Sequence, residues 1–117
     1  KDNEISERTS YLLGSVGLTD RQKHYPSELS GGEQQRVAIC RALSTKPAVV
    51  LADEPTGNLD SVRSQEIMDL FFKFNKEEKQ TFIIATHDPA FLEYADVVIK
   101  IKDGEVYERS DKYGTLI

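Results

Sequence analysis

Two short apolar runs constrain the fold of this chain more than any other feature. Ala48–Asp53 (AVVLAD) and Thr81–Asp88 (TFIIATHD) are rich in β-branched residues, and polar residues stand at their C-terminal ends. Runs of this kind are typical of buried strands in parallel sheets. Between them, apolar residues recur at helical spacing from Ile67 to Phe74. The order strand, helix, strand predicts an α/β fold with a parallel sheet.

The rest of the sequence predicts further helices and a hairpin. Apolar residues at helical spacing over 5–16 indicate a helix, and Gly17 stands where a C-terminal glycine cap is expected. A second helix is expected from about Gly32 to Ser44, and a short one from Pro89 to about Tyr94. The alternating segment around Asp103-Gly104 predicts a C-terminal β-hairpin with a two-residue turn.

Composition places the chain among globular proteins. Its 117 residues are 38% hydrophobic and 30% charged, and no apolar run approaches the roughly 20 residues of a membrane helix. A net charge of −5 argues against a basic face for nucleic acid. The single cysteine, Cys40, excludes an internal disulfide. Because the chain starts at Lys1 and opens directly into a helical pattern, we expect a piece of a longer protein; a complete small protein is the alternative.

Acidic and imidazole side chains follow both apolar runs. In parallel sheets, ligands bind beyond the carboxyl ends of the strands, where Asp53-Glu54 and Thr86–Asp88 both fall. Asp53 is suited to hold Mg²⁺ through water, and Glu54 to orient or deprotonate an attacking water. His87 is suited to donate to a phosphate or to that water, because imidazole takes either protonation state near neutral pH. The alternative is that the acids begin a solvated turn and that the histidine is structural.

The segment LSGGEQQR (29–36) has the features of an anion site at a helix N-terminus. Ser30 offers an N-cap hydroxyl, and Gly31 and Gly32 let backbone N–H groups approach an anion closely. The following helix adds the positive end of its dipole. Glu33, three residues after Ser30, permits a capping box. A well-capped helix without any ligand is the alternative.

Three other polar side chains are expected to have no special role. Arg36 and Arg41 are predicted to lie on solvated faces or to make local pairs. His24, in the polar segment before the glycines, is predicted to be exposed or structural.

Asp60 or Ser61 is predicted to cap the helix that lies between the two strands.

Three segments together resemble the ATP-binding-cassette (ABC) ATPases. LSGGEQQRVAICRAL (29–43) is similar to the family's signature motif, AVVLADEPTGNLDS (48–61) to its Walker B motif and D-loop, and IIATHD (83–88) to its H-loop. Their order makes the set specific, and the resemblance covers nearly the whole chain. Within the family, the sequences ADEPTGNLDS and LSGGEQQRVAI are most similar to the lipoprotein-release, macrolide-export and FtsE-like branch.

The resemblance implies roles for individual residues. Asp53 matches the Mg²⁺-associated aspartate, Glu54 the catalytic glutamate and His87 the switch histidine. Asp60 matches the D-loop aspartate at the dimer interface. Cys40 stands where alanine is common in the family, so we expect it to pack and to have no part in catalysis.

The signature residues are implied to act across a dimer. Ser30, Gly31 and Gly32 match the signature residues that contact the γ-phosphate of ATP bound to the opposite subunit, and Gln34 is expected among the cofactor-binding residues. The expected cofactors are therefore ATP and Mg²⁺, and the expected partners are a second copy of the nucleotide-binding subunit and transmembrane permease subunits, with no nucleic acid.

One expected motif of the family is missing. No GxxxxGK[ST] phosphate loop occurs in the sequence. We therefore expect the C-terminal part of an ABC-type, RecA-like P-loop NTPase domain. Residues 1–46 are predicted to end its helical subdomain and residues 47–117 to form part of the ATPase core. The piece alone is predicted to be inactive.

The full protein is expected to hydrolyse ATP as a dimer at the cytoplasmic face of the inner or plasma membrane and to drive export or extraction of a substrate. A soluble ABC-type ATPase in DNA repair, chromosome maintenance or translation is the alternative. The sequence TGNLD and the acidic net charge disfavour this soluble class. A non-catalytic interaction fragment is a third possibility.

Overall fold

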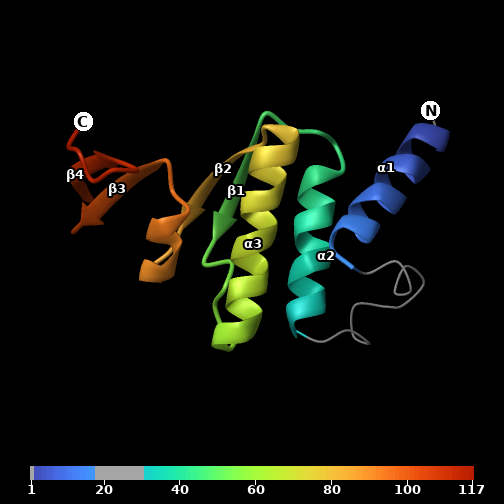
Figure 1. Cartoon of the computed structure of the whole chain (residues 1–117), viewed down its shortest axis with the longest axis horizontal. Coiled ribbons are helices and arrows are strands. Elements are labelled where there is room, and N and C mark those ends of the chain that lie inside the picture. The colour runs from blue at the N-terminus through green and yellow to red at the C-terminus, as the bar shows by residue number, and fades with distance from the viewer. Residues whose placement is uncertain (1, 18–30) are drawn as a thin grey trace. The chain divides into compact units, whose positions relative to one another are not determined.

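The computed structural model describes residues 2–17 and 31–117 of the chain, and Figure 1 shows their arrangement within each part. They fall into two compact units, Lys1–Ala85 and Thr86–Ile117. The helices and strands are, in order, α1 (Asp2–Ser15), α2 (Gly31–Leu43), β1 (Val49–Asp53), α3 (Ser61–Glu78), β2 (Thr81–Ala85), the 3₁₀ helix η3 (Pro89–Glu93), β3 (Val97–Lys102) and β4 (Glu105–Asp111). The predicted division into the end of a helical subdomain (1–46) and part of an ATPase core (47–117) stays a prediction.

The first unit is built on a two-stranded parallel sheet. β1 pairs with β2 in a register that places Val50 opposite Phe82 and Asp53 opposite Ala85. α3 connects the two strands, and α2 lies between α3 and α1 (Figure 1). The predicted parallel sheet with a helical crossover is confirmed.

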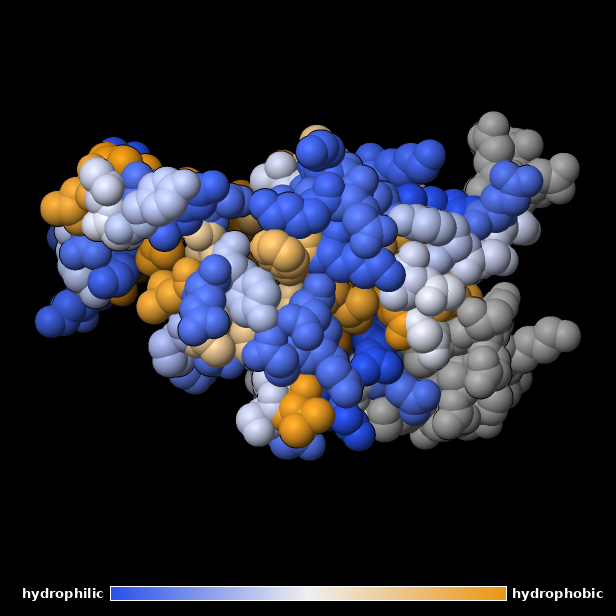
Figure 2. All heavy atoms as spheres, in the orientation of Figure 1, coloured by the Kyte–Doolittle hydropathy of each residue, from blue (hydrophilic) through white to orange (hydrophobic). Residues whose placement is uncertain are grey.

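The core of the first unit lies between the sheet and the three helices. Its four most deeply buried large side chains come from all three helices: Leu12, Leu43, Ile67 and Phe74. The rings of Phe71 on α3 and Phe82 on β2 meet edge-on with centroids 4.9 Å apart, an arrangement that aromatic pairs favour. The side of α3 that faces away from the sheet is turned toward the viewer in Figure 2, and hydrophilic residues cover most of it.

Defined caps end the helices of this unit. Asp60 is the N-cap of α3, and Lys79 ends that helix in the left-handed conformation with φ 58°. Gly17 follows α1 with φ 76°, and its N–H donates to the Gly14 carbonyl oxygen at 3.2 Å. The predicted glycine cap is confirmed, and of the two predicted candidates, Asp60 and Ser61, Asp60 is the N-cap.

An ion pair ties α1 to the ends of the other two helices. Arg8 donates to the carbonyl oxygen of Leu43, the last residue of α2, and to Glu78 Oε1, the last residue of α3, both at 3.0 Å. The Arg8 side chain is only 13% exposed, and these two bonds satisfy its charge in part, because Arg8 Nε and Glu78 Oε2 are buried without a hydrogen-bond partner among the described residues. The three helices are therefore joined at this point by polar contacts as well as by the core.

The expectation that both apolar runs are buried strands is wrong for one face of the sheet. Val50 is 7% exposed against the helices, whereas its neighbour Leu51 is 75% exposed and Ile83 58%. Alternate residues of a strand point to opposite faces, and among the described residues helices cover only one face. β2 is also shorter than predicted. It ends at Ala85 because Asp88 turns back, its N–H donating to Thr86 Oγ1 at 3.0 Å.

The second unit is the predicted hairpin preceded by a short helix. β3 and β4 pair antiparallel around Asp103 and Gly104, whose φ angles of 52° and 78° fit a two-residue turn. Lys100 Nζ and Glu108 Oε2 pair across the strands at 3.1 Å. η3 begins at Pro89, and Asp88 caps it by accepting from the Ala90 N–H. None of the helices in the described part of the chain is long and apolar enough to cross a membrane.

Candidate functional site

The two acids after β1 have different backbone conformations. Asp53 is the last residue of the strand, and its side chain is exposed. Glu54 takes a left-handed conformation with φ 47°, uncommon for a residue with a side chain. Its N–H donates to the Ala85 carbonyl oxygen at 2.7 Å, which extends the pairing of β1 with β2 by one residue. The end of the neighbouring strand therefore fixes where Glu54 leaves the sheet.

A tight turn follows Glu54. The Gly57 N–H donates to the Glu54 carbonyl oxygen at 3.0 Å, and Pro55 and Thr56 occupy the central positions. A Cβ atom on Gly57 would lie only 3.2 Å from that carbonyl oxygen, so glycine fits this close approach best. Pro55 and Thr56 are buried. The turn is thus an anchored part of the fold.

The two glycines at the start of α2 lie against the segment that leads into α3. A Cβ atom on Gly31 would lie 3.8 Å from Leu59 Cδ2, and one on Gly32 would lie 3.3 Å from Arg63 Cδ. Gly32 is buried although it stands in the first turn of its helix. The structure therefore brings the glycine pair and the residues around Asp60 together.

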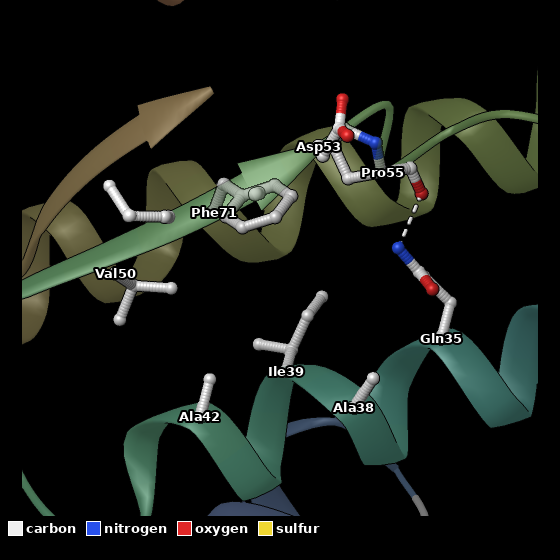
Figure 3. A pocket seen from close by; sticks show the side chains of 10 residues that line it. Gln35, Ala38, Ile39, Ala42, Val50, Asp53, Pro55 and Phe71 are labelled. Atoms are coloured by element: carbon white, nitrogen blue, oxygen red, sulfur yellow. Dashed lines mark hydrogen bonds between the residues drawn. The ribbon is translucent and has the colours of Figure 1, made fainter. Parts of the chain in front are cut away.

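A side-chain hydrogen bond joins α2 to the turn after Glu54. Gln35 Nε2 donates to the Pro55 carbonyl oxygen at 2.7 Å (Figure 3). Beside this bond an open, mainly apolar groove of about 120 Å³ separates α2 from β1. Figure 3 shows Ile39 and Ala42 pointing across it toward Val50.

Asp60 has a structural task within the chain. Its Oδ1 accepts the backbone N–H of Arg63 at 2.7 Å, in the usual manner of an N-cap aspartate. The residue is exposed at the point where α3 begins. Its position beside the glycine pair was not predicted from the sequence.

Arg36 departs from the sequence expectation. It pairs with Glu66 on α3, thirty residues away in the sequence. Glu66 also accepts from Arg63 Nη1 at 3.2 Å. No periodic pattern predicts a pair between two helices at this separation, so sequence reasoning missed it. Arg41 is exposed, as predicted.

Comparison with known proteins gives the site its family. Residues 1–57 match the family model described as ABC transporter. The chain is 51% identical over 105 residues to the macrolide export ATP-binding/permease protein MacB of Rhodopirellula baltica, covering 90% of this chain and 15% of that protein. It is 50% identical over 100 residues to the lipoprotein-releasing system ATP-binding protein LolD 1 of Chlorobium luteolum, covering 86% of this chain and 43% of that protein. The chain belongs to the ABC transporter family.

Solved ABC structures confirm the predicted fold. The dimeric ABC transporter cassette MJ0796 matches with a TM-score of 0.76 and 42% identity over 91% of this chain and 46% of that one. The cbiO1 protein of Clostridium perfringens, part of the complex cbiONQ, matches with a TM-score of 0.89 and 35% identity over 96% and 45%. The α/β fold is that of the ABC-type P-loop ATPases, and the chain spans under half the length of these relatives.

The structure does not test the roles expected of three residues of the ABC site. Ser30 lies outside the described residues, so its predicted capping box with Glu33 is untested. Gln34 is exposed on the first turn of α2. His87 is exposed and belongs to the second unit, two residues after β2 ends. Their roles stay predictions.

The donors near Asp53 suit a magnesium ion held mainly by water. Within residues 2–17 and 31–117, no three histidine, cysteine, aspartate or glutamate side chains gather in a way that could hold a metal. A single exposed carboxylate at a strand end fits Mg²⁺, which keeps several waters and takes few protein ligands. The role of Asp53 as a magnesium ligand stays a prediction.

Cys40 is a core residue of α2. It is 7% exposed, and burial raises the pKa of its thiol to about 11, against a smaller lowering by Arg8. A thiol that stays protonated is a poor nucleophile. The expectation that it packs is confirmed by this burial.

Proposed function

We propose that the full protein containing this chain binds and hydrolyses ATP as the nucleotide-binding subunit of an ABC transporter. One observation carries the proposal. The Gly31–Gly32 pair lies against the segment from Leu59 to Arg63, so two motifs that the family uses at its dimer interface form one surface. The dimeric MJ0796 cassette, 42% identical, supports the same arrangement of subunits.

In this proposal Glu54 acts on the water that attacks the γ-phosphate. Its left-handed backbone and its hydrogen bond to Ala85 hold it just beyond the strand, where a carboxylate is able to orient or deprotonate water. Asp53 would hold Mg²⁺ through water, and the ion when bound neutralises phosphate charge. His87 donates to the γ-phosphate or to the same water.

Closure of a homodimer completes the site. Ser30, Gly31 and Gly32 of one subunit contact the γ-phosphate of ATP bound to the other, with the N-terminus of α2 directed at the anion and Gln34 among the nucleotide-binding residues. Asp60 lies at the interface. A structure of MJ0796 bound to ADP and Pi, 41% identical, supports a nucleotide at the corresponding dimer. Hydrolysis removes the phosphate that bridges the subunits and so opens them.

The transporter assignment rests on the relatives. MacB is named an ATP-binding/permease protein, LolD belongs to a lipoprotein-releasing system, and cbiO1 is part of a transporter complex. We therefore propose permease partners, a place at the cytoplasmic face of the membrane, and export or extraction as the transport. No relative named above supports a soluble repair or translation ATPase.

The phosphate loop would come from residues outside the 117 given. Without its lysine and backbone cradle, the isolated chain is expected to bind Mg-ATP weakly or not at all and to show no ATPase activity. Calorimetry on the isolated chain tests this, and submicromolar affinity for ATP would contradict it.

The Glu54→Gln variant of the full protein tests the proposed reaction. It keeps the size of the side chain and removes the base, so ATP turnover should fall at least about a hundredfold while ATP binding persists and the dimer accumulates. The matched control is Glu77→Gln, an exposed position in the last turn of α3. Unchanged turnover in Glu54→Gln would remove the residue from this role.

A further inference from the structure

Glu66 joins two arginines that come from different helices. Its Oε2 accepts from Arg36 on α2, and its Oε1 accepts from Arg63 on α3 at 3.2 Å. Each carboxylate oxygen therefore serves one guanidinium. We call these three residues the Glu66 clasp.

Arg63 connects the Glu66 clasp to the signature glycines, because its side chain lies against Gly32. A Cβ atom on Gly32 would lie 3.3 Å from Arg63 Cδ and 3.9 Å from Arg63 Cγ, so the aliphatic part of this arginine covers Gly32. The backbone N–H of the same residue donates to Asp60 Oδ1 at 2.7 Å. Arg63 is thus in contact with a signature glycine, the D-loop aspartate and Glu66 at once.

The two ion pairs of the Glu66 clasp differ in how much they contribute to holding the helices together. Arg63 and Glu66 are three residues apart on one helix, and the Arg63 side chain is 52% exposed, so this pair adds little to stability. Arg36 is 22% exposed and reaches from another helix. The Arg36–Glu66 pair is therefore the one that fixes α2 against α3.

The Glu66 carboxylate supplies a countercharge near two helix N-termini. Arg63 lies in the first turn of α3, where the positive end of the helix disfavours a cation. Arg36 lies in the second turn of α2, where this effect is smaller. Glu33 and Glu66 are the acids that line the same polar hollow, which also includes Gly32. Loss of Glu66 would leave two guanidiniums at two helix N-termini with one fewer countercharge.

We propose that Glu66 is a positioning residue that holds the signature glycines in register with the D-loop, so that both motifs meet the opposite subunit together. The inference rests on the proposed function, because it assigns Glu66 to closure of the ATP-bound dimer. Glu66 does not contact the residues proposed for water activation, so binding of ATP to its own subunit should not depend on it.

The test uses the full protein in the Glu54→Gln background, in which ATP-driven dimers accumulate. Glu66→Gln should raise the protein concentration needed for half-dimerisation about tenfold, a change within the usual range for coupled sites. The affinity of the monomer for ATP should not change. Glu77→Gln, the same change at an exposed position of α3, is the control.

A double-mutant cycle separates positioning from general destabilisation. If the clasp acts through Arg36, then Arg36→Gln combined with Glu66→Gln should weaken dimerisation little more than either change alone. Glu66→Asp keeps the charge and should restore part of the loss, which also covers the case in which Glu66→Gln folds poorly.

The outcomes are distinct. Dimerisation of Glu66→Gln equal to that of the Glu77→Gln control, or additive effects in the cycle, would overturn the inference and leave the proposed function intact. If the Glu54→Gln protein with Glu66 intact forms no dimer with ATP, the proposed function fails and the inference with it.

Discussion

Gln35 Nε2 lies 2.7 Å from the carbonyl oxygen of Pro55 and donates a hydrogen bond to it. The bond crosses from the helix of the signature motif to the turn that follows Glu54. One amide group therefore links the turn beside the proposed base to α2, the helix whose N-terminus we propose to contact the partner's ATP.

We expect Gln35→Glu to lower ATP turnover of the full protein several-fold. The substitution keeps the shape but replaces a donor with an acceptor, so a carboxylate would face the carbonyl oxygen and the turn would shift. Loss of the bond should also lower the free energy of unfolding by about 1 kcal/mol. Steady-state ATPase assays and denaturant titrations measure both.

Gln65→Glu is the control for this change. Gln65 is exposed on α3 and donates to Asp69 within its own helix. If turnover falls equally in both variants, the bond from Gln35 to the turn has no particular part in the reaction.

Phe74→Ala should be among the more destabilising substitutions in α3. Phe74 is 1% exposed at the centre of the core. Removing a buried phenyl group costs about 3–5 kcal/mol, since the cavity refills only in part. Phe72→Ala, two residues away, removes a ring that is 44% exposed and lies 5.2 Å from Lys76 Nζ, so its cost should stay below about 1 kcal/mol. Equal shifts of the denaturation midpoint would contradict the described core.

The reactivity of Cys40 should depend on folding. Because burial raises the pKa of its thiol from 9.0 to about 11, the folded protein at about pH 8 should alkylate slowly at this position and the unfolded protein quickly. Mass spectrometry of the peptide that contains Cys40 measures the two rates. Fast alkylation in the folded state would contradict the burial.

The same shift predicts a pH dependence of stability. The folded pKa is higher than the unfolded one, so the contribution of Cys40 is fully present below pH 9.0 and is lost as the pH rises toward about 11. Cys40→Ala should remove this part of the decline. An identical decline in the variant would assign it to other groups.

The isolated 117-residue chain should self-associate through the sheet of the first unit. Leu51 and Ile83 lie exposed on one face of β1 and β2, and a two-stranded sheet leaves edges that other strands are able to pair with. Leu51→Lys should reduce association in sedimentation experiments. Val62→Lys, at a residue 61% exposed on α3, is the control. A monomer at high concentration would contradict the prediction.

Local patterns predicted most of the secondary structure. The β-branched run before Asp53 and the Asp103-Gly104 turn each allow few backbone conformations, so their elements could be predicted from neighbours in the sequence. The end of β2 could not. Whether Thr86 and Asp88 continue a strand or bond to their own backbone is decided by small energy differences.

The geometry of the site was less accessible. The motifs indicated which residues matter, but the contacts of Gly32 with Arg63 and of Arg36 with Glu66 join segments about thirty residues apart. Such contacts follow from how α2 and α3 pack, and no local periodicity encodes them. The left-handed backbone of Glu54 was missed for a related reason, since it depends on the pairing of its N–H with Ala85.

That backbone conformation limits what mutagenesis can teach about position 54. At φ 47°, a β-branched residue is strongly disfavoured, whereas glycine, asparagine and aspartate fit readily. In a saturation library at Glu54, activity would therefore depend first on whether each variant can form the turn and only then on the chemistry of its side chain. Inactive valine, isoleucine or threonine variants would report on folding of the turn, and only residues that tolerate the left-handed conformation would report on the base.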